Sequence, residues 1–97
     1  MYTHNINYLL QKIFTSKDVL SFDEIYYKKY IYLKKYINKI YNYVNDKSLY
    51  SKNDIIQESW LNIWLQITDK HVVIRSEKEF DLFLMDVVNN TISELNR

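Results

Sequence analysis

Few residues of this chain have the types and spacing that catalysis or metal binding requires. The two histidines, His4 and His71, lack the paired spacing of a metal-binding helix. We expect both to be solvent-exposed and to have no functional role. Acidic residues such as Asp81 and Asp86 could pair as general acid and base, but such carboxylates usually form a solvated helix face. The chain contains no glycine, which excludes Gly-rich phosphate loops, and no cysteine, which excludes thiolate chemistry. We therefore expect no enzyme, no cofactor and no metal site.

A stretch rich in lysine and tyrosine, YYKKYIYLKKY at residues 26–36, offers a different chemistry. Lysines can hold phosphates and tyrosine rings can stack on unpaired bases, so the stretch could contact nucleic acid. The simpler interpretation is a solvated helix face, because half of the tyrosines fall on the apolar stripe. Residues 22–47 hold six lysines against three acids, whereas residues 51–97 hold five basic residues against eight acids. The net charge is only +1, so any attraction to nucleic acid must be local.

The composition indicates one small helical domain. Its 97 residues can fill one hydrophobic core, and the absence of Gly and Pro excludes folds that are rich in hairpins. Hydrophobic residues make up 47% and charged residues 26%, as in soluble globular proteins. No apolar run approaches the roughly 20 residues that cross a bilayer, and the N-terminal sequence lacks the features of a signal peptide. We expect a cytoplasmic protein without membrane contact.

Apolar residues at steps of three and four predict four helices. Residues 3–14 form a weaker, accessory helix, so we divide the chain into an N-terminal segment, residues 1–21, and a main domain, residues 22–97. Three longer amphipathic helices follow in that main domain: one runs to about Asn45, and the others begin after Ser51 and Ser76.

A Ser-x-x-acid pattern marks the start of each longer helix. In such a capping box, the serine hydroxyl and the carboxylate each accept a hydrogen bond from a free backbone amide. Residues 68–75, between the last two helices, contain three consecutive β-branched residues and predict an ordered loop, with a short extended piece as the alternative. The predicted capping pairs are Ser21 with Glu24, Ser51 with Asp54, and Ser76 with Glu79.

The segment NDIIQESWLNIW, residues 53–64, resembles the region 2.2 helix of sigma-70 family factors, especially the extracytoplasmic-function type. The usual family form is Asp-Leu-Val-Gln-Glu-x-Phe-Leu-x-Leu-Trp. The segment from Phe22 to Leu33 is similar to the family's opening helix, and the segment from Phe80 to Asn90 is similar to a later one. The resemblance covers about residues 22–97. It implies an all-α fold, a sigma region 2-like bundle of three main helices plus an N-terminal helix.

In that family, region 2 docks on the clamp-helix coiled coil of the RNA polymerase β′ subunit. The resemblance implies that this chain binds the same partner through one strip of its region 2.2-like helix, where acids and amides could meet Arg and Asn side chains. Ile56, Trp60, Ile63 and Trp64 would divide between the domain core and the apolar centre of the contact. Alternatively, the acids are an ordinary capped first turn and the tryptophans simply core. The expected contact residues are Asp54, Gln57, Glu58, Asn62 and Trp64.

The family also reads and melts the −10 promoter element with the loop before its last region 2 helix and with that helix. The likeness is weaker there, because Asp81 and Asp86 stand where the family often has Arg, and acids repel phosphates. The residues that the resemblance assigns to promoter DNA are Lys70, His71, Arg75, Asn90 and Arg97.

The chain ends where region 2 of the family ends, so a promoter-reading region 4 is expected on a separate protein. We therefore expect an RNA polymerase-binding, sigma-like transcription initiation factor, with the region 4 protein or an anti-sigma factor as further partners. One alternative is a sigma-mimicking inhibitor or appropriator from a phage or mobile element, which occupies the clamp helices without opening DNA. Another is a helical homodimeric adaptor that buries Trp60 and Trp64 between two copies.

Overall fold

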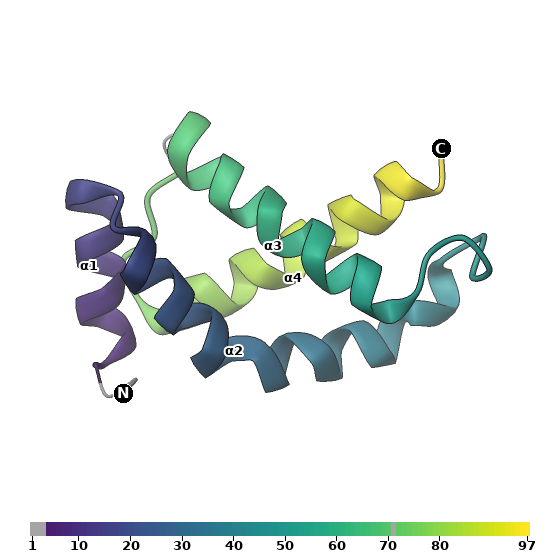
Figure 1. Cartoon of the computed structure of the whole chain (residues 1–97), viewed down its shortest axis with the longest axis horizontal. Coiled ribbons are helices and arrows are strands. Elements are labelled where there is room, and N and C mark those ends of the chain that lie inside the picture. The colour runs from purple at the N-terminus through teal and green to yellow at the C-terminus, as the bar shows by residue number, and fades with distance from the viewer. Residues whose placement is uncertain (1–3, 71) are drawn as a thin grey trace.

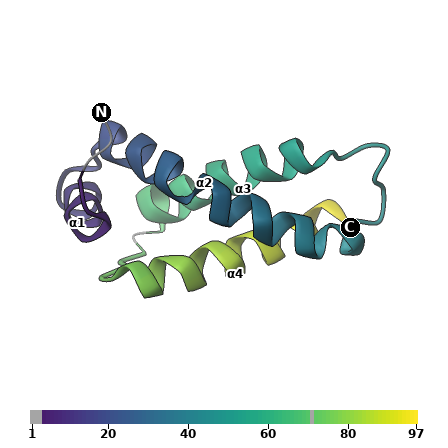
Figure 2. The same ribbon diagram turned by 90° about the horizontal axis from the view of Figure 1, so that it is seen from below.

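The computed structural model describes residues 4–70 and 72–97. In this part, the chain forms four α-helices, one short 3-10 helix and no strand. Helix α1 crosses one end of the molecule, and α2, α3 and α4 run along its length (Figure 1); Figure 2 shows α1 end-on. This confirms an all-α fold with an N-terminal helix and three longer ones. The elements are α1 (Ile6–Ser16), α2 (Val19–Ile40), η1 (Tyr41–Tyr43), α3 (Lys52–Asp69) and α4 (Glu77–Leu95).

Helix α2 begins earlier than the sequence predicted. Its N-cap is Asp18, and Ser21 lies buried inside the first turn, where its hydroxyl donates to the Asp18 carboxylate at 2.6 Å. The predicted capping box of Ser21 with Glu24 is therefore wrong. The turn from α1 is short because Lys17 adopts the left-handed conformation, with φ 53°, and its amide donates to the carbonyl of Ile13.

The starts of α3 and α4 agree better with the predicted capping. The Ser51 hydroxyl accepts from the Asp54 amide at 3.1 Å, and the Asp54 carboxylate accepts from the Ser51 amide at 2.8 Å. At α4, the Ser76 hydroxyl accepts from the Glu79 amide at 3.2 Å. The Glu79 carboxylate, however, accepts from the Arg75 amide at 3.0 Å, so only half of that box forms.

Two other helix ends differ from the predicted boundaries. Helix α2 ends at Ile40 and is followed by η1, so the predicted helix to Asn45 is too long. Helix α3 continues to Asp69, which takes the first two residues of the predicted 68–75 loop into the helix. Apolar periodicity locates the body of a helix, but helix ends fray and often finish in a 3-10 turn, as α2 does at η1.

The core consists of two clusters that share Trp60. The first cluster lies toward α1 and includes Phe22, Ile63 and Phe80; the second includes Leu33 and residues from the far ends of α3 and α4. The Trp60 ring stacks on Phe22 with centroids 4.5 Å apart. Helix α1 contributes four buried side chains to the first cluster: Ile6, Leu9, Leu10 and Ile13.

Candidate functional site

The outer face of α3 carries a strip of exposed side chains, which we call the α3 strip: Asp54, Gln57, Glu58, Leu61 and Leu65. The first three are exposed, as the sequence predicted, and they occupy the N-terminal half of the helix. Leu61 and Leu65 follow at steps of three and four, and they are 51% and 41% exposed. The strip thus has an acidic and amide half followed by an apolar half.

Two of the predicted polymerase contacts lie off this strip. Asn62 faces α4, and its Nδ2 donates to the Thr91 hydroxyl at 3.0 Å. Trp64 is half-buried and packs on Phe22 of α2, with ring centroids 4.6 Å apart. The structure therefore brings Asp54, Gln57 and Glu58 together and assigns Asn62 and Trp64 to contacts between helices.

The apolar half of the α3 strip was missed by the sequence analysis. Ile56 and Ile63 are fully buried, and the Trp60 ring is stacked in the core, so these residues offer little to a partner. Leu61 and Leu65 are the apolar side chains that remain available on this helix. The signal was present in the sequence, because the helical steps that place Glu58 outside place both leucines outside as well.

A hollow of about 370 Å³ adjoins the acidic half of the α3 strip. One wall consists of Asp54, Gln57 and Glu58. The other walls consist of Leu95 of α4 and of Leu49 and Tyr50, which lie in the loop before α3. An apolar surface next to carboxylates suits a long basic side chain, whose stem packs on apolar atoms while its charged end reaches the acids.

The polar groups of the α3 strip are partly positioned by their neighbours. One oxygen of Asp54 is held by the Ser51 amide in the capping box. Burial raises the pKa of the Tyr26 hydroxyl, neighbouring Tyr30 raises it further, and a side-chain hydrogen bond with Gln57 opposes the rise.

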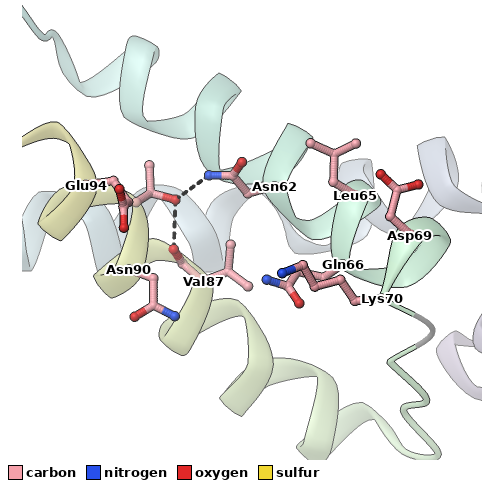
Figure 3. Close-up of a pocket in the computed structure, with 9 residues that line it drawn as sticks. Asn62, Leu65, Gln66, Asp69, Lys70, Val87, Asn90 and Glu94 are labelled. Carbon is pink, nitrogen blue, oxygen red and sulfur yellow. Dashed lines mark hydrogen bonds between the residues drawn. The ribbon is translucent and has the colours of Figure 1, made fainter.

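A groove of about 440 Å³ lies between the C-terminal halves of α3 and α4 (Figure 3). Lys70 and Asn90, two of the predicted DNA contacts, both line it. Asp69 and Glu94 line the same groove, and their carboxylates repel a phosphate backbone. The groove therefore unites two predicted residues in surroundings of mixed charge.

The other predicted DNA contacts lie elsewhere. Arg75 lines a separate hollow between α1 and the segment before α4. Arg97 is exposed beyond the end of α4 and pairs with Glu94 at 3.4 Å. His71 lies outside the described residues. In the part of the chain that the structure describes, the residues predicted to contact DNA are thus dispersed, except that Lys70 and Asn90 share one groove.

A buried ion-pair cluster joins α2 to the start of α4. Lys29 is 7% exposed, and its Nζ lies 2.5 Å from Glu77 and 2.7 Å from Asp81. Burial opposes the charge on Lys29, but hydrogen bonds to Asp81 and Glu77 outweigh it and raise the pKa of the ammonium group. The expectation that Asp81 belongs to a solvated face is therefore wrong, because it is a structural partner of Lys29.

His4 also has a structural role that the sequence analysis did not foresee. Its backbone amide donates to the Glu24 carboxylate at 2.9 Å, and its Nδ1 lies 2.9 Å from the same carboxylate. The His4 ring stacks on Tyr8, with centroids 5.1 Å apart. These contacts fix the segment that leads into α1 against α2.

Chemically, the α3 strip places carboxylate and amide acceptors beside exposed apolar side chains. Within residues 4–70 and 72–97, no group of three or more His, Asp or Glu residues is placed to hold a metal ion. No helix in that part of the chain is long and apolar enough to cross a bilayer. Comparison with protein families, curated proteins and solved structures finds no match to this chain.

Proposed function

We propose that this protein is a sigma-like factor that docks on the β′ clamp helices of RNA polymerase through the α3 strip. The observation that carries the proposal is the joint exposure of Asp54, Gln57 and Glu58, in the segment that resembles region 2.2 of the sigma-70 family. The factor acts in the cytoplasm, in promoter-specific initiation, and works with a region 4 module. Its contribution is docking and not catalysis.

The chemistry of the strip supports such a contact. Carboxylates that meet Arg side chains form charge-assisted hydrogen bonds, each worth about 1.5–3 kcal/mol when water is excluded. Leu61 and Leu65 lie beside these acids and can exclude water from them. Acids at one end and leucines at the other also define the direction in which a partner helix lies on α3.

Titration calorimetry with a fragment of the β′ clamp helices tests the proposal. We expect Gln57→Ala and Glu58→Ala to weaken binding by about 1–3 kcal/mol, the usual cost of truncating such a contact. Asp86→Ala is the matched control, since Asp86 is an exposed carboxylate on α4 that does not line the hollow beside the α3 strip. The proposal would be contradicted if the unchanged protein did not bind, or if Asp86→Ala lost as much affinity as the two α3 variants.

A second candidate function keeps the docking but changes its result. Asp69 and Glu94 line the same groove as Lys70 and Asn90, and this favours a sigma mimic that occupies the polymerase without opening promoter DNA. Both candidates displace a host sigma factor from the core enzyme. Only the initiator gives unpaired promoter bases when a region 4 protein is supplied, and permanganate reactivity of thymines would detect them.

The homodimeric adaptor remains a third possibility with a simple test. It requires Trp60 and Trp64 at a dimer interface, whereas both rings pack on Phe22 within one chain. Light scattering over a wide concentration range would show a constant monomer mass under the polymerase-docking proposal, and a rising mass under the adaptor hypothesis.

A further inference from the structure

Three lysines from three different segments converge on one groove, which we call the α2–α3 groove. Its volume is about 470 Å³, and it lies between the C-terminal half of α2, the loop after η1 and the first turn of α3. Lys34 comes from α2, Lys47 from the loop and Lys52 from α3. None of the side chains that line it is a carboxylate. The groove therefore concentrates positive charge in a chain whose net charge is only +1.

Two of the three lysines, Lys47 and Lys52, are held in place without being neutralised. The Lys47 ammonium donates to the carbonyls of Val44 at 3.0 Å and Asn42 at 3.3 Å. The ammonium groups of Lys47 and Lys52 lie 5.9 Å and 5.4 Å from the centre of the Tyr41 ring. Carbonyl dipoles and an aromatic face orient a cation but leave its full charge, whereas a carboxylate would cancel it.

The surroundings of the groove lysines differ from those of Lys29, which lies on α2 with Lys34. Lys29 is paired with two carboxylates, so its charge is used within the fold. Among the described residues, the ion pairs of His4, Lys29 and Arg97 do not include a lysine of the α2–α3 groove. Gathering like charges in a hollow is unfavourable, and an anion between them removes that cost.

The remaining lining of the groove defines the kind of anion. Asn38 and Asn53 add neutral amide donors beside the ammonium groups, which suits a ligand with several acceptor oxygens. Ile37 and Ile56 are buried and form an apolar floor. Several cations, neutral donors and an apolar floor together match a phosphate ester with an organic group attached better than they match a simple ion.

We infer that the α2–α3 groove binds a phosphate ester about the size of one nucleotide, carried by a free nucleotide or by single-stranded nucleic acid. The inference goes beyond the docking function and does not depend on it. Asp54, Gln57 and Glu58 do not line this groove, so the two surfaces are formed by different residues.

The test uses the full chain at low salt with two probes: ATP by titration calorimetry, and a labelled twelve-residue oligothymidylate by fluorescence anisotropy. The double variant Lys34→Glu/Lys52→Glu is expected to bind at least about tenfold more weakly than the unchanged protein, because two attractive charges become repulsive. The control is Lys35→Glu/Lys39→Glu, which makes the same charge change at exposed positions of α2 outside the groove. The control should retain affinity within about twofold.

The outcomes separate the two sources of the phosphate. Binding of both probes, with ATP displacing the oligonucleotide, identifies a free nucleotide as sufficient, whereas binding of the oligonucleotide alone identifies the nucleic-acid backbone. If neither probe binds, or if the control variant loses affinity equally, the inference is overturned. Should the Glu variant fail to fold by circular dichroism, Lys34→Gln/Lys52→Gln replaces it, with a smaller loss expected because charge is removed and not reversed.

Discussion

The ammonium group of Lys29 lies 2.7 Å from the carboxylate of Asp81, and this pair joins the middle of α2 to the first turns of α4. The Lys29 side chain is 9% exposed, whereas those of Asp81 and Glu77 are 28% and 54% exposed. A buried ammonium that loses its partner is costly, because water cannot replace the missing carboxylate. The two acids should therefore matter unequally to stability.

Replacing these acids one at a time tests that inequality. We expect Asp81→Asn to lower the free energy of unfolding by about 1.5–3 kcal/mol, because it removes the better buried partner of Lys29. Glu77→Gln should cost no more than about 1 kcal/mol, as is usual for an exposed ion pair. Urea unfolding followed by circular dichroism at neutral pH measures both. Equal losses would show that Lys29 does not distinguish its two partners.

The contact between His4 and Glu24 makes stability depend on acidity. Burial would raise the pKa of Glu24, but hydrogen bonds from the His4 side chain and backbone outweigh it and lower the pKa below its ordinary value of 4.5. The stabilisation is therefore present above pH 4.5 and is lost as the pH falls through the lowered pKa of the folded protein. The difference in unfolding free energy between the unchanged protein and Glu24→Gln should shrink over that range. A difference that stays constant down to pH 3 would contradict this prediction.

Neighbouring positions on α3 should separate docking from folding. Leu61 is 51% exposed and Ile63 is fully buried, so Leu61→Ala should change the unfolding free energy by less than about 0.5 kcal/mol and Ile63→Ala should lower it by about 2–5 kcal/mol. In binding, Leu61→Ala should weaken the clamp-helix contact, since its side chain lies on the α3 strip. Thermal melts and calorimetry on the same samples give both quantities. A Leu61 variant that is unstable would remove this residue from the proposed contact.

Asn96 joins the end of α4 to the last residue of η1 and to the chain just after it. Its Nδ2 donates to the Tyr43 carbonyl at 2.8 Å, and its Oδ1 accepts from the Asn45 amide at 2.9 Å. Asn96→Ala should leave the Asn45 amide without its partner and speed its exchange with solvent by about tenfold or more. Hydrogen exchange measured by NMR tests this directly, and Asn89→Ala offers a comparison on α4. Unchanged exchange at Asn45 would mean that this contact does not order the segment.

Much of the fold could be predicted because periodicity and capping are local. The Ser51 and Asp54 box formed as expected, since both of its partners lie within one turn of backbone. The prediction that Ser21 caps a helix was wrong because the helix begins three residues earlier, with Asp18 as its N-cap. Ser21 therefore lies in the first turn. The pattern of a serine followed by an acid is the same in both segments, and only the surroundings decide which one caps a helix.

The candidate site was less predictable because its contacts join distant segments. Asn62 and Trp64 lie on α3 together with Glu58, but they face neighbouring helices. Asn62 donates a hydrogen bond to Thr91 of α4, and Trp64 packs on Phe22 of α2. The pairing of Lys29 with Asp81 depends on how α2 and α4 cross, which no local pattern records. Helical steps from Glu58 are sufficient to predict the outward position of Leu61.

Helix α4 supplies buried side chains to both core clusters, with Phe80 and Leu84 in the first and Val88 and Ile92 in the second. Among the four α-helices, it is also the last in chain order. During synthesis, neither cluster can therefore be completed before α4 has emerged from the ribosome. Until then, α1, α2 and α3 keep part of their apolar faces exposed, and such surface promotes aggregation of incompletely folded chains.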